Sequence, residues 1–210
     1  MPFFYGSLPR YVAAACGINC VRPYPISLQF AEQKMTAVFE VGKRLNLTTV
    51  DVPGTHGLIR TVSPSSIALV QGSVDNRYCG VYVFSLQSGG GNPVPWYVGL
   101  AKKQTLGVES LEKDKLRKYA AAMFGRRGSP SLTFIYPVGN ASIKGIDGLE
   151  TLLIWIARSK NPNLLNEKKI SGKPNSIISL TNYICVKGVI NRGQGQPSKV
   201  ALDFIGMMGL

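Results

Sequence analysis

This 210-residue sequence has few acidic residues: 11 Asp and Glu stand against 24 Lys and Arg, a formal net charge of +13. It also lacks any apolar run near the roughly 20 residues that a membrane-spanning helix needs. A domain this basic typically binds a polyanion or an anionic surface, although surplus charge can also serve solubility alone. The sequence therefore predicts a protein without a membrane span, whose partner is negatively charged.

Cysteine and histidine are scarce, with four Cys and one His. Cys16 and Cys20 are spaced CxxxC, Cys79 and Cys185 stand apart, and His56 is isolated, whereas zinc sites use closely paired ligands. The N-terminus lacks the basic start and continuous apolar stretch of a signal peptide. We therefore expect a cytoplasmic protein with reduced, structural thiols.

The first third of the chain is irregular and rich in proline. The segment SLQFAEQKMTAVFEVGKRLNL, residues 27–47, predicts a helix because Ser27 can cap it and apolar residues recur at roughly helical spacing. Two short β-prone runs follow, separated by Gly, Pro and Ser. We expect residues 1–75 to form an N-terminal extension of unknown role.

The strongest patterns lie in residues 76–169. CGVYVFSL and WYVGLA predict two antiparallel strands, because the segment GGGNPVP between them has strong turn chemistry. SLEKDKLRKYAAAMF predicts a helix capped by Ser110 with an apolar stripe that includes Phe124. SLTFIYPV predicts a third strand, and GLETLLIWIARSKNP a largely buried helix that ends before Pro162. This order implies an α+β fold with a small antiparallel sheet flanked by helices.

The tail, residues 170–210, forms a C-terminal extension in this interpretation. NYICVKGVI predicts a strand. SKVALDFIGMM predicts a short helix whose apolar face packs on the core.

Five features in this order resemble the GIY-YIG nuclease superfamily. They are Gly80-Val81-Tyr82, Tyr97-Val98-Gly99, a basic helix, Glu150 within LETLLI, and Asn166 within NPNLLNEKK. The resemblance spans residues 78–168, and we expect a GIY-YIG-like nuclease core there. It implies a hydrolase, a metal-dependent endonuclease that cleaves phosphodiester bonds in DNA.

Glu150 is the candidate metal ligand. Phosphodiester hydrolysis needs an activated water and charge stabilisation on the phosphate, which a divalent cation can supply. Mg²⁺, or Mn²⁺ in its place, binds through one or two carboxylates plus phosphate oxygens and water. The resemblance implies that Glu150 is the single protein ligand. The alternative is that the carboxylate only interacts with a helix N-terminus.

Tyr82 and Tyr97 are candidate catalytic residues. A tyrosine has an ordinary pKa near 10, so it needs nearby cations to act as a general base. The resemblance implies that one tyrosine activates or orients the attacking water while the other positions phosphate or solvent. The alternative is that the two rings only pack across a hairpin.

The basic helix departs from the family pattern, which has an arginine soon after the second strand and a Tyr or His four positions later. The closest match is Lys115 with Tyr119, spaced to share one helical face. Lysine lacks the guanidinium fork that clamps phosphate, and Leu100 stands where the family often has lysine. We assign catalytic roles to Lys115 and Tyr119, with Arg117 as the alternative.

A belt of basic residues predicts contacts with the phosphate backbone, and the resemblance gives Asn166 a supporting role through hydrogen bonds. The predicted partner is DNA, with RNA as an alternative, and a homodimer is a candidate assembly because double-strand cleavage often needs two sites. A weak or inactive nuclease fold that binds DNA or RNA is the second hypothesis, and an unrelated basic interaction protein is the third. The belt comprises Lys102, Lys103, Lys113, Lys115, Arg117, Lys118, Arg126 and Arg127, with Arg158, Lys160, Lys168 and Lys169 later in the chain.

Overall fold

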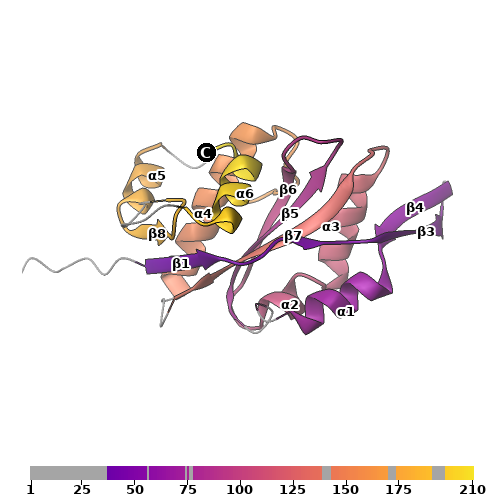
Figure 1. The fold of residues 1–210 in the computed structure, drawn as a ribbon, viewed down its shortest axis with the longest axis horizontal. Helices are drawn as coiled ribbons and strands as arrows, with labels where there is room; N and C mark the ends of the chain where they lie inside the picture. The colour runs from indigo at the N-terminus through magenta and orange to yellow at the C-terminus, as the bar shows by residue number, and fades with distance from the viewer. Residues whose placement is uncertain are drawn as a thin grey trace, which may run out of the picture. The chain divides into compact units, whose positions relative to one another are not determined.

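A six-stranded mixed sheet forms the centre of the computed structural model (Figure 1). The structure describes residues 37–55, 57–73, 75, 78–138, 143–169, 174–190 and 197–210, all within a unit that spans Lys34–Leu210. The strand order is β6-β5-β7-β1-β8, and β2 also pairs with β7. The strands are β1 (Ala37–Val41), β2 (Leu45–Asn46), β5 (Gly80–Gln87), β6 (Val94–Ala101), β7 (Ser129–Pro137) and β8 (Ile184–Val186).

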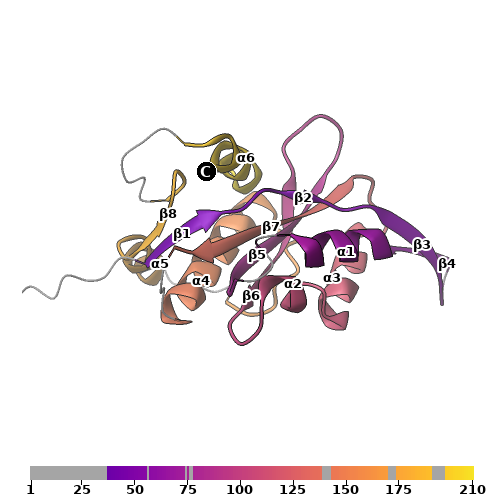
Figure 2. The same cartoon turned by 60° about the horizontal axis from the view of Figure 1, so that its bottom comes forward.

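Helices cover both faces of this sheet (Figure 2). On one face lie α4 (Ile143–Lys160), α5 (Pro174–Thr181) and α6 (Lys199–Met208); on the other lie α1 (Pro64–Gly72), α2 (Leu106–Glu109) and α3 (Lys113–Met123). The side chains of β5 alternate between these layers: Val81 and Val83 pack in the α4 cluster, and Tyr82 and Phe84 in the α3 cluster. Each face therefore has its own buried core.

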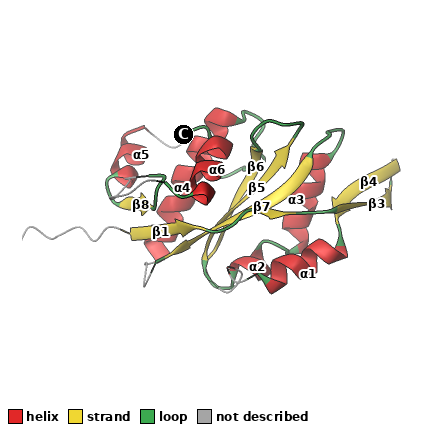
Figure 3. Cartoon of the chain, in the orientation of Figure 1, coloured by secondary structure: helices red, strands yellow, loops and turns green. Residues whose placement is uncertain are grey.

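A separate hairpin of β3 (Thr49–Gly54) and β4 (Gly57–Val62) follows β2 (Figure 3). Its Arg60 side chain donates hydrogen bonds to the backbone carbonyls of Arg126 and Gly128, which ties the hairpin to the loop between α3 and β7. The hairpin thus accounts for the two β-prone runs of the first third.

The α+β class is confirmed, and β5, β6, α3, β7 and α4 follow in the expected order. The sheet is not purely antiparallel, because β8 pairs in parallel with β1. Both of these strands come from outside residues 76–169, so the flanking segments complete the sheet. Of the described residues, none belongs to a helix long and apolar enough to cross a membrane.

The expected helix over residues 27–47 is wrong where the structure describes it, since Ala37–Val41 and Leu45–Asn46 are strands. The buried residues in β1 are Ala37, Phe39 and Val41, which is the period of two of a strand and not the spacing of a helix. Residues 27–36 of this expected helix lie outside the described residues.

The ends of two helices also differ from expectation. The N-cap of α3 is Glu112, not Ser110, and Phe124 is 70% exposed and not part of a buried stripe. α4 begins at Ile143, five residues before the expected start, and so includes Asp147. This helix therefore carries two carboxylates, Asp147 and Glu150.

Candidate active site

A pocket of about 410 Å³ lies beside β6, the edge strand of the sheet. Its lining residues come from four segments that are distant in sequence. They are Tyr97 and Leu100 of β6, Lys118 of α3, Asp147, Glu150 and Ile154 of α4, and residues 166–169. The three α4 residues have the i, i+3, i+7 spacing of one helical face.

The chain after α4 covers the outer edge of β6. The Leu165 amide donates to the Trp96 carbonyl at 2.9 Å. The buried Asn166 side chain accepts from the Val98 amide at 2.9 Å and donates to the Val98 carbonyl at 2.7 Å. Asn166 therefore takes the place of a neighbouring strand, and it fixes residues 167–169 next to Tyr97.

Tyr82 and Tyr97 lie on neighbouring strands with ring centroids 6.2 Å apart. Tyr82 pairs with Gly99 across the strands, and its phenol fills the space where a Cβ at position 99 would be. Tyr82 is fully buried and Tyr97 is 7% exposed. Tyr97 lines the pocket, whereas Tyr82 packs beneath it.

Burial raises the pKa of both phenols. For Tyr97 the charge of Lys115 opposes this rise, and the approach of the Tyr82 hydroxyl toward the Tyr97 hydroxyl also lowers the pKa of Tyr97, to a smaller extent. That approach does not reach hydrogen-bond geometry, and the Tyr82 hydroxyl has no partner among the described residues. The Lys118 ammonium lies 4.8 Å from the centroid of the Tyr97 ring. Tyr97 is thus the phenol that can contact a ligand, with two lysines nearby.

Glu150 is 8% exposed, and its carboxylate is paired with lysine. The Lys169 ammonium lies 2.6 Å from Glu150 Oε2 and 3.0 Å from Asp147 Oδ1, and the Lys102 ammonium lies 2.5 Å from the same Asp147 oxygen. Burial raises the pKa of Glu150 while the Lys169 hydrogen bond lowers it, and the Lys102 hydrogen bond holds the pKa of Asp147 below its ordinary value. Two carboxylates and two ammonium groups therefore form one ion-pair cluster, and Asp147, Glu150 and Lys169 of this cluster line the pocket.

The position of Glu150 removes the helix-terminus alternative. α4 begins seven residues earlier, at Ile143, and the field of a helix end fades within its first turn. A buried carboxylate in mid-helix is stable only with a cation beside it, which here is Lys169.

Two carboxylates one helical turn apart match the donors that Mg²⁺ prefers. The described residues contain no group of three or more His, Cys, Asp or Glu able to hold a metal ion. Phosphate oxygens and water would have to complete the coordination. Because Lys169 contacts both carboxylates, a divalent cation fits only after this ammonium moves away.

Lys115 and Tyr119 do not line the pocket. The Lys115 ammonium lies 2.7 Å from Asp114 and 3.4 Å from Glu109, and these acids with Tyr97 raise its pKa against the effect of burial. Tyr119 is fully buried, stacks on Phe84 at 4.1 Å and donates to the Ser110 carbonyl at 2.9 Å. The structure thus assigns Tyr119 to the core.

The other basic residues of the belt differ in their exposure and in the residues that they contact. Lys103, Arg117 and Arg127 are exposed. The Arg126 guanidinium lies 4.2 Å from the ring centroid of Trp96. Among these residues, Lys118 lines the pocket and lies over the Tyr97 ring, and Lys102 pairs with the lining residue Asp147.

Asp147 had no role assigned from the sequence, and Lys169 was expected only to contact phosphate as a later member of the basic belt, not to pair with Glu150. Asp147 could have been found from its spacing, three residues before Glu150 on a helix that starts earlier than expected. Lys169 carries no such signal. It follows Glu150 by nineteen residues in an irregular segment, where its backbone has a positive φ of 63°.

No protein-family model matches this chain, and no curated protein or solved structure is significantly similar to it.

Two buried tyrosines provide a stability test of this arrangement. Tyr119→Phe leaves the Ser110 carbonyl without its donor, so the free energy of unfolding should fall by about 1–2 kcal/mol. Tyr82→Phe removes a hydroxyl that has no partner, so the same quantity should stay constant or rise by up to about 1 kcal/mol. Urea unfolding of both variants measures the difference. An equal loss in both would mean that Tyr82 has a partner after all.

Proposed function

We propose that this protein is a metal-dependent endonuclease that hydrolyses phosphodiester bonds in DNA at the pocket beside β6. The observation that carries the proposal is the convergence of a phenol, a buried carboxylate and several ammonium groups in one pocket. Tyr97, Glu150 and Asn166 come from separate segments that resemble the GIY-YIG nucleases. The net charge of +13 supports a polyanionic substrate.

In this proposal Tyr97 accepts the proton of the attacking water or orients that water. Its raised pKa makes the phenolate rare at neutral pH but a strong base when it forms. Lys115 favours the phenolate without leaving its own carboxylate partners. The exposed Lys168 and the half-buried Lys118 at the rim supply contacts to the phosphate backbone.

Glu150 and Asp147 would hold the metal, and Lys169 would leave them when it binds. A bound Mg²⁺ or Mn²⁺ supplies Lewis acidity and orients the phosphate. The freed Lys169 ammonium would still line the pocket, where a phosphate oxygen could replace its carboxylate partners. In this exchange the carboxylates would pair with the metal and Lys169 with the phosphate, so that every buried charge keeps a partner.

A second candidate function is binding of DNA or RNA without cleavage. The observation that favours it is the ion pair between Lys169 and Glu150, which already neutralises the proposed metal ligand. Leu100, which lines the pocket where the related enzymes often have lysine, favours it as well.

Substitution of Glu150 separates the two functions. Glu150→Gln removes the buried anion, so Mg²⁺-dependent plasmid cleavage should fall about a hundredfold or more while DNA affinity is retained. The matched control is Glu167→Gln, because Glu167 lines the same pocket but is exposed. Cleavage assays with EDTA blanks and fluorescence anisotropy give the two quantities. Full activity of Glu150→Gln would refute the nuclease proposal.

Removal of the competing ammonium tests the metal site without any activity assay. Lys169→Met keeps the length of the side chain but frees Glu150 Oε2, so Mn²⁺ should bind about tenfold more tightly, or ~1.4 kcal/mol. Lys168→Met, at the exposed neighbour, is the control for net charge. Isothermal titration of Mn²⁺ into each protein measures Kd. Equal affinities of the two variants would show that Lys169 does not occupy a metal position.

A further inference from the structure

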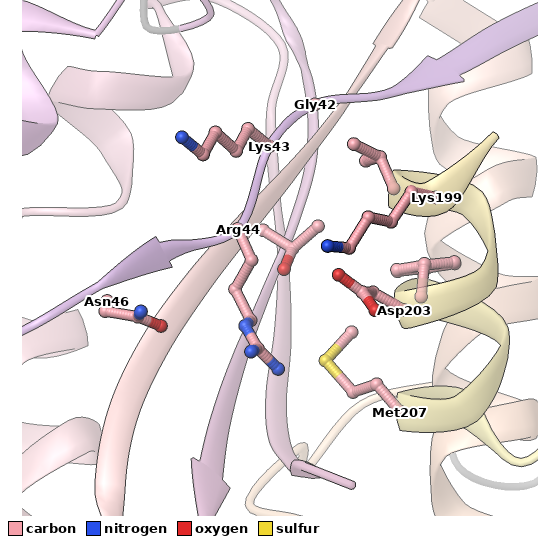
Figure 4. Close-up of a pocket in the computed structure, with 10 residues that line it drawn as sticks. Gly42, Lys43, Arg44, Asn46, Lys199, Asp203 and Met207 are labelled. Carbon is pink, nitrogen blue, oxygen red and sulfur yellow. The ribbon is translucent and has the colours of Figure 1, made fainter.

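A second pocket, of about 320 Å³, lies between α6 and the bend that joins β1 to β2 (Figure 4). The strands β5 and β7 separate β6 from β1 in the sheet, and the two pockets share no lining residue. The α6 side of this pocket includes Lys199, Asp203 and Met207, which are spaced i, i+4, i+8 along one helical face. This pocket is therefore independent of the candidate active site.

The bend is held in place by the protein itself. The Gly42 amide donates to the Phe134 carbonyl at 2.8 Å, and a Cβ at position 42 would overlap the Asp75 carboxylate. The Lys43 backbone and the Tyr136 hydroxyl lie close enough to Asp75 to lower the pKa of its carboxyl against the larger effect of burial, which raises it. The pairing of β1 with β7 thus ends at a fixed bend, which directs Arg44 toward α6 (Figure 4).

Charged groups face this space from both walls. Figure 4 shows the Arg44 guanidinium extending from the strand side and Lys199 and Asp203 from α6. None of these three side chains forms an ion pair or hydrogen bond with another described residue. The buried Phe204 and Met207 side chains supply an apolar wall. The pocket therefore presents free cations, a free carboxylate and apolar surface together.

We propose that this pocket binds a phosphate monoester of mononucleotide size. Arg44, Lys199 and Asp203 give the groups that face the pocket a net charge of +1, and Lys43, whose ammonium extends away from α6 in Figure 4, raises the net charge of the lining to +2. This positive charge suits the one to two negative charges of a phosphomonoester at neutral pH. The Arg44 fork suits two phosphate oxygens. Asp203 requires a donor, which a ribose hydroxyl or a base amino group provides. The volume lies at the lower end of small-ligand sites.

The test is binding of adenosine 5′-monophosphate by isothermal titration calorimetry, with inorganic phosphate and adenosine as partial ligands. We expect one bound nucleotide per chain, with affinity reduced about tenfold in Arg44→Gln and in Lys199→Gln because each loses a charge-assisted contact. Arg158→Gln and Lys187→Gln make the same charge changes on exposed residues outside the pocket and should bind as wild type. Absence of saturable binding, or equal losses in all four variants, would overturn the proposal.

Two further arms identify the ligand more closely. Asp203→Asn should weaken binding of the nucleotide but not of inorganic phosphate, and a nucleotide that binds this variant more tightly would contradict a role for its hydroxyl or amino groups. Tighter binding of a 5′-phosphorylated oligonucleotide than of its 5′-hydroxyl form would show that the pocket accepts the phosphorylated end of a strand as well as a free nucleotide. If neither the oligonucleotide nor the nucleoside binds more tightly with a 5′-phosphate than without one, the pocket is not a phosphate site. Glu150→Gln should leave nucleotide binding unchanged, so this inference can fail while the nuclease proposal stands.

Discussion

The covered edge of β6 is the constraint on which the candidate site depends. Asn161 donates to the Pro95 carbonyl at 2.8 Å, and Asn166 bonds both the amide and the carbonyl of Val98. These amide side chains hold an irregular segment against an edge strand whose polar groups would otherwise be open. Because the segment begins at the end of α4, its attachment to β6 also sets the position of Glu150 relative to Tyr97. One set of hydrogen bonds therefore assembles the pocket from both faces of the sheet.

Charge inside the pocket is balanced more closely than the charge of the whole chain. The protein carries a formal net charge of +13, yet Glu150 and Asp147 each have a lysine within hydrogen-bond distance. A buried carboxylate needs such a partner, and either an ammonium group or a divalent cation can fill the role. In our proposal, the choice between these cations distinguishes a nuclease from a nucleic-acid-binding protein built on the same scaffold. Under either proposed function the basic rim would contact phosphate, because such contacts give affinity without chemistry.

The sequence predicted the central elements well, because β5, β6 and β7 are apolar runs with strong turn signals and α3 and α4 are long periodic segments. It failed at β1, because residues 37–41 are too short a run to separate a helical from a strand period. The pairing of this segment with β7 and β8 makes it a strand. Three residues of the GIY-YIG-like motifs, Tyr97, Glu150 and Asn166, line one pocket in the structure. Burial of Tyr119 and the contact of Lys169 with Glu150 could not be predicted, because both depend on tertiary packing between distant segments.

The most direct test of the central claim is a crystal structure with Mn²⁺ and a phosphorothioate oligonucleotide that resists cleavage, with the metal located by anomalous scattering. The account predicts one Mn²⁺ bound to Glu150 and to an oxygen of the substrate phosphate, with Lys169 moved off the carboxylate and the Tyr97 hydroxyl facing the same phosphate. Mn²⁺ at another place, or a strand that passes the β6 edge with Glu150 still paired to Lys169, would contradict it.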